Sequence, residues 1–306
     1  MNILLLLGLP EETRVKYPER LKREFPGFKV DCVDHHSKVG PYIGEAEVLI
    51  TFGPNMSDAV LQQAPRLKWI QALGTGVDGI CDQPSLRPDV LVTNLRGVHG
   101  DAMSEAAIMS MLALARDLPR NVRNQARREW GRWPVRLITG KTAGILGVGA
   151  IAEALAPRLK ALGMTVIGIS SGARAVPGFD RMEPKHRLAD TAPELDYLVL
   201  LTPYSKETHH LVDARILAAM KPGSFLVNLA RGGVVDEAAL VAALDVFATE
   251  PLPPDHALWG MENVIITPHL GGFHDEYADR ALPVIVGNMR KYLAGDTGGM
   301  LNRVRR

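Results

Sequence analysis

The chain has 306 residues, of which 46% are hydrophobic and 23% are charged, and this length fits two domains rather than one core. Its formal net charge of +1 provides no long-range field to attract nucleic acid or an acidic membrane surface. The two cysteines, Cys32 and Cys81, have no metal-ligand spacing and indicate a reducing compartment. We therefore expect a cytoplasmic globular protein that binds neither nucleic acid nor membrane and holds no metal.

Short apolar runs alternate with amphipathic stretches in the first third of the chain, a pattern typical of parallel strands covered by helices. The run Ile3–Leu7 has no basic flank and is too short to span a bilayer, so it predicts a buried strand. The other predicted strands here are Phe28–Val33, Val48–Thr51 and Leu67–Gln71, and the predicted helices are Arg14–Phe25 and Ser57–Gln63.

The middle of the chain begins with a long helix and continues with an arginine-rich segment. Asp101 is expected to cap a helix that runs to Arg116 with apolar residues at core spacing. The segment 120–136 interleaves arginines with Trp130 and Trp133. Such a segment could bind RNA, but the near-neutral chain favours a subunit interface, where Trp and Arg are enriched. We therefore predict a homodimer with a dimerisation arm at about residues 100–140.

A mononucleotide-binding unit follows, with strand Thr142–Leu146, helix Ile151–Leu162 and strand Thr165–Ser170. Gly163 stands where the end of a helix favours a left-handed residue. Further strands are predicted at Tyr197–Leu201, Phe225–Leu229 and Val264–Thr267, and a last helix at Leu282–Leu293 returns to the first domain. The predicted fold is α/β with two doubly wound parallel sheets. The domains are 1–97 with 276–306 for the substrate, and 98–275 for a dinucleotide.

The turn Gly147-Val148-Gly149-Ala150-Ile151-Ala152 carries the dinucleotide prediction. A G-x-G-x-x-A string alone is weak, but this one follows an apolar strand and opens a helix. Gly147 permits the tight turn, Gly149 lets a pyrophosphate approach, and Ala152 allows close packing of helix on strand. The amides of Ala150 and Ile151 at the helix start would then hold the phosphates.

The end of the next strand distinguishes NAD from NADP. An NAD enzyme usually has a carboxylate there for the ribose 2′-hydroxyl. Here the strand ends in Ser170-Ser171-Gly172-Ala173-Arg174, with no carboxylate. The two serines and Arg174 can surround a 2′-phosphate, which favours NADP over NAD. The alternative is that Arg174 simply extends into water.

Four further segments complete a family pattern: Leu73–Asp78, Val227–Asp236, Asp245–Pro253 and Asn263–Gly272. With the glycine loop, they resemble the D-isomer-specific 2-hydroxyacid dehydrogenase family over nearly the whole chain. The resemblance implies a Rossmann cofactor domain inserted in a flavodoxin-like substrate domain. The cofactor loop without a carboxylate and the short chain are similar to the NADP-linked glyoxylate and hydroxypyruvate reductases of that family.

The resemblance also implies roles for single residues. Arg231 matches the arginine that pairs with the substrate carboxylate and polarises its carbonyl, and His269 matches the acid–base histidine. Glu250 matches the carboxylate beside that histidine, and a neighbouring anion favours the protonated imidazole. Each lies just beyond a predicted strand, where open α/β sheets bind ligands. The other positions carried over are Asp245 for the nicotinamide carboxamide, Thr202, Pro203, Ala230 and Gly271 for the cofactor, and Leu73, Gly74, Thr75 and Gly76 for the substrate carboxylate.

The chain departs from the family between Asp236 and Asp245, where a helix start and a strand end are fused in Glu237–Leu244. A parallel crossover needs about a dozen residues including its helix. We expect either a helix reduced to a turn or two, or a lost strand that no longer holds Glu250 against His269. The sequence thus leaves two functions open. One is a 2-keto acid reductase, and the other is a dinucleotide-binding sensor with weak turnover; the 2-hydroxy acid itself is not predicted.

Overall fold

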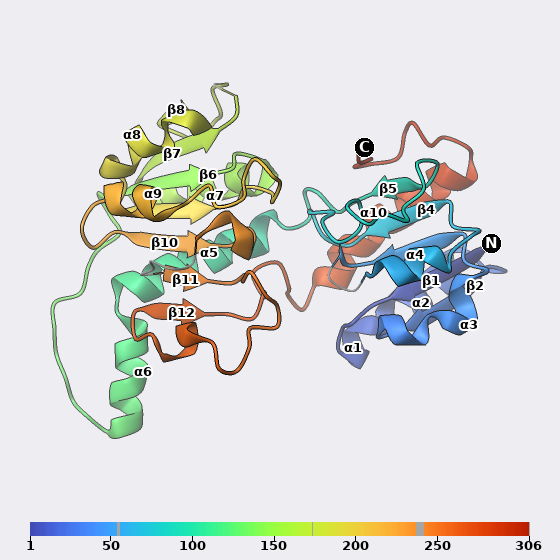
Figure 1. Cartoon of the computed structure of the whole chain (residues 1–306), viewed down its shortest axis with the longest axis horizontal. Helices are drawn as coiled ribbons and strands as arrows, with labels where there is room; N and C mark the ends of the chain where they lie inside the picture. The colour runs from blue at the N-terminus through green and yellow to red at the C-terminus, as the bar shows by residue number, and fades with distance from the viewer. Residues whose placement is uncertain (54–55, 173, 237–241, 306) are drawn as a thin grey trace. The chain divides into compact units, whose positions relative to one another are not determined.

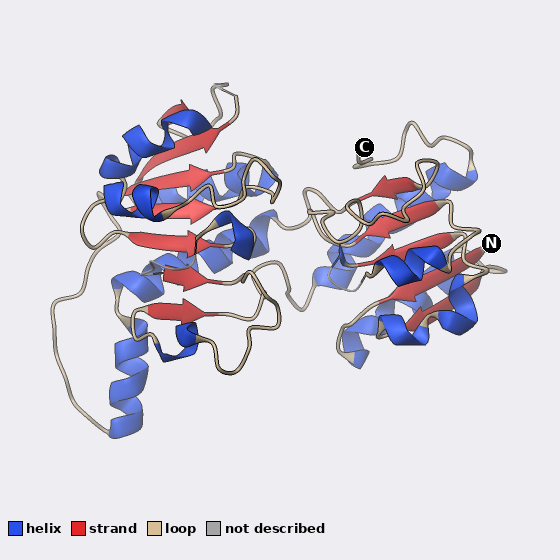
Figure 2. Cartoon of the chain, viewed as in Figure 1, coloured by secondary structure: helices blue, strands red, loops and turns tan. Residues whose placement is uncertain are grey.

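The computed structural model describes residues 1–306 except 54–55, 173, 237–241 and 306. Contacts divide the chain into two compact units, Met1–Val98 with His274–Arg306, and His99–Phe273. The second unit is therefore inserted in the chain of the first. Each unit has its own parallel sheet with helices against it (Figures 1 and 2), which confirms the predicted fold class. Within the described residues, no helix combines the length and the apolar character needed to cross a bilayer.

The first unit has a five-stranded sheet in the order β2-β1-β3-β4-β5, the order of flavodoxin-like sheets. Its strands are β1 Asn2–Leu6, β2 Lys29–Val33, β3 Val48–Thr51, β4 Trp69–Ala72 and β5 Leu91–Thr93. Its helices are α1 Glu11–Arg14, α2 Lys16–Glu24, η1 His36–Lys38, α3 Gly40–Ile43, α4 Asp58–Gln62 and the last helix of the chain, α10 Tyr277–Leu293.

Strand β1 has side chains buried on both of its faces. Ile3 and Leu5 pack with Tyr17 of α2 and with residues of α10, whereas Leu4 and Leu6 pack with residues of α3 and α4. Because both faces are covered by helices, the strand is a continuous apolar run rather than an alternating one.

The second unit has a seven-stranded sheet in the order β12-β11-β10-β9-β6-β7-β8. The chain starts inside the sheet with β6, passes through β7 to the edge strand β8, and then runs from β9 to β12 in the other direction, as in a dinucleotide-binding fold. Its strands are β6 Thr142–Leu146, β7 Thr165–Ser170, β8 Arg181–Pro184, β9 Tyr197–Leu200, β10 Phe225–Asn228, β11 Ala242–Leu244 and β12 Val264–Ile266. Its helices are α5 Gly100–Ala115, α6 Leu118–Arg127, α7 Ala150–Ala161, η3 Lys185–Arg187, α8 Leu188–Thr191, η4 Ala192–Glu194, α9 Ala214–Ala219, η5 Gly232–Val234 and η6 Ala257–Gly260.

The start of α5 differs from the prediction. The helix begins at Gly100 with His99 as its N-cap residue, so Asp101 lies inside the first turn and does not cap it. Instead, an Asp101 carboxylate oxygen lies 2.5 Å from Nη2 of Arg158 on α7. Asp101 therefore joins α5 to α7 through this ion pair.

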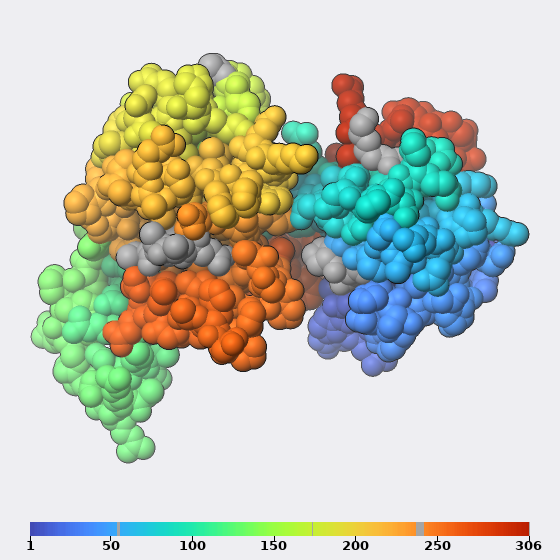
Figure 3. All heavy atoms as spheres, in the orientation of Figure 1, coloured from blue at the N-terminus to red at the C-terminus, as the bar shows by residue number. Residues whose placement is uncertain are grey.

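The arginine-rich segment contains a helix that the sequence pattern did not predict. Helix α6 projects from the rest of the second unit (Figures 1 and 3), and the chain returns along an extended stretch (Figure 1). Two arginines of the segment stack on aromatic rings, Arg120 on Trp133 at 4.1 Å and Arg136 on Phe225 at 5.1 Å from the ring centroids.

Strand β11 is present in spite of the shortened crossover. Its residues pair in parallel with β10 on one side and with β12 on the other. The expectation of a lost strand is therefore wrong. Residues 237–241, where a short helix was the other possibility, lie outside the described residues, and the described part of the connection contains only η5.

Candidate active site

The glycine loop joins β6 to α7. Gly147 has a φ of +101°, and a Cβ atom there would lie 2.5 Å from the backbone nitrogen of Thr202. Only glycine therefore fits this turn. At Gly149, by contrast, an added Cβ would meet no atom of the described residues within 4 Å. Gly149 is also the N-cap residue of α7, and no described side chain caps that helix. The first amides of α7, including those of Ala150 and Ile151, thus suit a phosphate group.

The residues after β7 lie beside the first turn of α7. Ser170 donates a hydrogen bond from Oγ to the Gly172 carbonyl at 2.7 Å. Arg174 forms an ion pair with Glu153 of α7, with 2.6 Å between Nη2 and Oε1. Arg174 therefore does not simply extend into water. Both side chains are exposed, and such pairs contribute little to stability, so a phosphate can replace the carboxylate.

The residues after β9 form a compact turn next to the glycine loop. Thr202 is buried, and Pro203 accepts a hydrogen bond from the Thr208 hydroxyl at 2.8 Å. Because β9 neighbours β6 in the sheet, this turn borders Gly147.

Arg231 lies in a turn that Asn228 organises. Oδ1 of Asn228 accepts from the Ala230 amide at 3.0 Å, and Nδ2 donates to the Arg231 carbonyl at 3.1 Å. Arg231 is half-buried, and its Nη1 donates to the Ala230 carbonyl at 2.7 Å. Gly232 follows, and an added Cβ would lie 1.9 Å from the carbonyl carbon of Phe247. Asn228 was not among the predicted site residues, although a polar residue at the end of a buried strand was a usable signal.

Asp245 follows β11 and fastens the loop that carries His269. Its buried carboxylate accepts from Oγ1 of Thr267 at 2.6 Å and from the amides of Leu270 and Gly271 at 2.8 Å each. Its own carbonyl accepts from the His269 amide at 2.9 Å. The predicted nicotinamide contact would have to share these oxygens. Thr267 was not predicted as a site residue.

Glu250 and His269 are brought together, with 2.7 Å between Oε2 and Nδ1. The second carboxylate oxygen of Glu250 accepts from the Phe247 amide at 2.9 Å, which fixes its orientation. His269 has a φ of +54°, a strained backbone conformation held by the Asp245 contacts. The alternative in which a lost strand no longer holds Glu250 against His269 is therefore wrong, because β11 keeps its place in the sheet.

Burial raises the pKa of Glu250, but other contacts outweigh it. The hydrogen bonds from His269 and from the Phe247 amide, together with the positive charges of His269 and Arg231, leave the pKa below its ordinary value of 4.5. Glu250 is therefore an anion at neutral pH and can stabilise a protonated His269.

Replacement of Glu250 by glutamine should lower kcat/KM by about 100-fold, because a neutral amide no longer stabilises the imidazolium.

Since folding lowers the pKa of Glu250, ionisation of this carboxyl stabilises the fold above pH 4.5. The stabilisation is lost as the pH falls through the pKa that Glu250 has in the folded state. The loss of unfolding free energy in Glu250→Gln should therefore shrink below pH 4.5. Denaturant titrations at neutral and acidic pH measure this, and a loss that grows on acidification would contradict the assignment.

The predicted substrate loop belongs to the first unit. Leu73, Gly74, Thr75 and Gly76 directly follow β4, at the carboxyl end of that sheet. Leu73 is buried, and its amide donates to the carbonyl of Thr51, the last residue of β3, at 2.9 Å.

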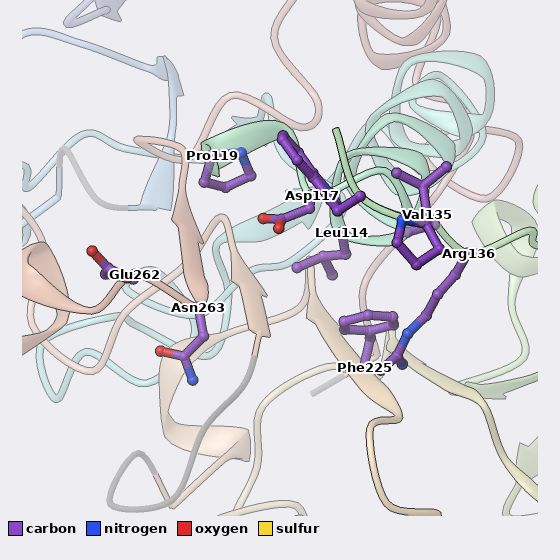
Figure 4. Close-up of a pocket in the computed structure, with 11 residues that line it drawn as sticks. Leu114, Asp117, Pro119, Val135, Arg136, Phe225, Glu262 and Asn263 are labelled. Carbon is purple, nitrogen blue, oxygen red and sulfur yellow. The ribbon is translucent and has the colours of Figure 1, made fainter. Parts of the chain in front are cut away.

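A pocket of about 220 Å³ lies elsewhere in the second unit (Figure 4). It is lined by Leu114, Ala115, Asp117, Pro119, Glu262 and residues 133–136. The other lining residues are Phe225, which starts β10, and Asn263, which precedes β12. These positions are at the amino ends of the strands, whereas Arg231, Glu250 and His269 follow the carboxyl ends. We therefore do not assign the pocket to the same site.

Comparison with known proteins gives a consistent result. Residues 108–271 match the family model for the NAD binding domain of D-isomer specific 2-hydroxyacid dehydrogenases. The chain is 32% identical over 271 residues to the D-3-phosphoglycerate dehydrogenase of Methanocaldococcus jannaschii, covering 83% of this chain and 51% of the relative. The chain thus spans about half the length of the phosphoglycerate dehydrogenases that it matches.

Two other relatives are covered almost completely. The glyoxylate reductase of Aeropyrum pernix is 32% identical over 312 residues, with 92% of each chain covered. Among solved structures, the NADPH-dependent glyoxylate/hydroxypyruvate reductase of Sinorhizobium meliloti, in complex with NADP and sulfate, superposes with a TM-score of 0.84. Its identity to this chain is 25%, with 99% of this chain and 98% of that chain covered.

Proposed function

The chain belongs to the D-isomer-specific 2-hydroxyacid dehydrogenase family, and on this premise we propose that it transfers a hydride between a nicotinamide cofactor and a small 2-keto or 2-hydroxy acid. The observation that carries the proposal is the 2.7 Å contact between Glu250 and His269. It pairs an acid–base group with an orienting anion, as a proton-transfer site requires.

The roles of the residues follow from their chemistry. The nicotinamide supplies the hydride when it is bound. Arg231 pairs with the substrate carboxylate and polarises the neighbouring carbonyl, so that the carbonyl carbon accepts the hydride. His269 donates its proton to the carbonyl oxygen as the alcohol forms, and Glu250 stabilises the charged imidazole before that transfer. In oxidation His269 removes the hydroxyl proton.

Residues 98–275 are proposed to bind the cofactor, and residues 1–97 with 276–306 the substrate. Support comes from the open space at Gly149 and the uncapped start of α7. The substrate carboxylate is assigned to the amides of the loop Leu73–Gly76. Glyoxylate and hydroxypyruvate are the proposed substrates, supported by the names of the Aeropyrum pernix and Sinorhizobium meliloti relatives.

NADP is the proposed cofactor, because no carboxylate follows β7 and Arg174 lies beside the start of α7. Arg174→Ala should raise the KM for NADPH about tenfold, since a charged hydrogen bond to phosphate is lost, and should leave the KM for NADH unchanged. Steady-state kinetics with both cofactors measure this. Arg181→Ala, which removes an arginine paired with Glu183 and Glu194 on β8 and η4, is the control. Equal changes for the two cofactors would contradict the role of Arg174.

A homodimer is proposed through α5 and the segment 118–137. This part of the second unit exposes apolar side chains, among them Trp130, which is 94% exposed, Val122 and Met109. Aromatic, Met and Arg side chains are typical of such interfaces. Light scattering should give twice the 33.3 kDa of one chain, and a monomer would refute the proposal. A cytoplasmic location is also proposed, since a chain of 306 residues with two cysteines is typical of a reducing compartment.

The test of the proposed function is oxidation of NADPH and NADH with a panel of 2-keto acids. We expect turnover with glyoxylate and hydroxypyruvate, in the range of about 1–10³ per second that is ordinary for enzymes. Cofactor binding without turnover, measured by fluorescence titration, would instead favour the sensor function.

A further inference from the structure

The carbonyl groups of the loop Leu73–Thr75 are all held by donors of the first unit. The Leu73 carbonyl accepts a hydrogen bond from the Tyr277 hydroxyl. The Gly74 carbonyl accepts from the Leu95 amide at 3.0 Å, and the Thr75 carbonyl accepts from Nδ2 of Asn94 at 2.7 Å.

Holding these carbonyls also orients the amides of the loop. In a trans peptide plane, the C=O of one residue and the N–H of the next point in opposite directions. The three bonds therefore set the directions of the N–H groups of Gly74, Thr75 and Gly76. These are the amides assigned above to the substrate carboxylate.

Tyr277 is the first residue of α10 and is only 1% exposed. Its ring packs against Phe52, with 6.1 Å between ring centroids, and against His274 at 5.7 Å. Burial raises the pKa of Tyr277, with a further contribution from Tyr17, so its hydroxyl stays protonated and can donate to the Leu73 carbonyl.

Asn94 directly follows β5, and both its side chain and its backbone form hydrogen bonds. Its Oδ1 accepts from the Arg96 amide at 3.1 Å. Its backbone amide donates to the carbonyl of Asn302 at 3.1 Å, and Nδ2 of Asn302 donates back to the Asn94 carbonyl at 3.3 Å. The Asn94 side chain is therefore a fixed donor rather than a mobile one.

We propose that Tyr277 and Asn94 are positioning residues that hold the Leu73–Gly76 amides in place for the substrate carboxylate. This inference rests on the proposed function, in which these amides bind the carboxylate. Neither side chain touches the substrate, and both act through the loop carbonyls. The carboxylate is bound equally in the ground state and the transition state, so loosening the loop raises KM and leaves kcat unchanged.

Tyr17 offers a matched control on the neighbouring helix α2. Its side chain is as buried as that of Tyr277, and its hydroxyl has no hydrogen-bond partner among the described residues. Tyr17→Phe and Tyr277→Phe each remove one buried oxygen from the same core cluster. Only the second removes a hydrogen bond to the loop.

The experiment compares these variants in steady-state reduction of glyoxylate. Tyr277→Phe should raise the KM for glyoxylate about tenfold, with kcat and the Kd for NADPH unchanged, because one hydrogen bond to a buried carbonyl is lost. Tyr17→Phe should leave all three constants unchanged. If Tyr277→Phe does not fold, Asn94→Ala tests the same loop and should also raise KM. An unchanged KM in the folded variants, or an equal rise in Tyr17→Phe, would overturn the proposal.

Amide hydrogen exchange gives a second result that needs no turnover. Peptides that cover residues 73–76 should exchange faster in Tyr277→Phe than in Tyr17→Phe. If the wild-type chain lacks turnover but this difference is found, the proposed function fails while the positioning of the loop stands. If turnover is normal and neither exchange nor KM changes, the positioning role alone is refuted.

Discussion

His269→Ala is expected to lower kcat for reduction of hydroxypyruvate by about 10²–10⁴-fold, the usual contribution of a general acid. The variant lacks the imidazole that is proposed to protonate the carbonyl oxygen, while the proposed phosphate site at the start of α7 is unchanged. The Kd for NADPH should therefore stay within about twofold of the wild-type value. Rapid mixing with saturating NADPH, together with a fluorescence titration, measures both quantities.

His186 provides the control for this variant, since it is exposed in η3 of the same unit. His186→Ala should turn over like the wild-type chain. If His269→Ala kept more than a tenth of wild-type kcat, another group would have to supply the proton.

Arg231→Ala is expected to lower kcat/KM by about 10²–10³-fold, because the carboxylate loses its partner and the carbonyl loses a donor that stabilises developing charge. Arg231→Lys should recover only part of this loss, because an ammonium lacks the planar fork that pairs with a carboxylate. Steady-state kinetics with glyoxylate measure both variants.

Arg215 is a suitable control for Arg231, since its side chain is 79% exposed and is paired only weakly, at 3.7 Å, with Asp213. Arg215→Ala should leave kcat/KM unchanged. Full activity of Arg231→Lys would show that charge alone suffices and would contradict the paired geometry.

The strands buried on both faces could be predicted closely from the sequence. Val48–Thr51, Thr142–Leu146 and Thr165–Ser170 have the predicted bounds, and Gly163 has the expected left-handed backbone. These runs are apolar because helices cover both sides of the sheet.

Short strands and local contacts were less predictable. Strand β5 has only three residues, and β8, at the sheet edge, has no apolar run, so neither has a pattern that stands out. The predicted capping role of Asp101 was also wrong. Its carboxylate pairs with Arg158, which is far away along the chain, instead of with the backbone at the start of the helix.

The motifs identified the candidate site residues, but the contacts between them depend on tertiary structure. Asp245 holds Thr267 and Gly271, which are more than twenty residues away along the chain. Such bonds form because two loops meet at one end of the sheet, and no local pattern encodes them. The same holds for the Tyr277 contact with Leu73.

The shortened crossover left two outcomes open from its length alone. A connection too short for a full helix predicted either a helix reduced to a turn or two or a lost strand, and the lost strand is wrong. Pairing of Ala242–Leu244 with two neighbouring strands keeps the strand in place, and Glu250 remains against His269.

Hydride transfer by this protein is tested most directly by following the hydride itself. NADPH that carries deuterium at both C4 positions would be incubated with hydroxypyruvate and the purified chain, and the product examined by mass spectrometry and chiral separation. We expect D-glycerate with one deuterium on C2, formed much more slowly by His269→Ala. Absence of glycerate, or glycerate without deuterium, would contradict hydride transfer by this protein.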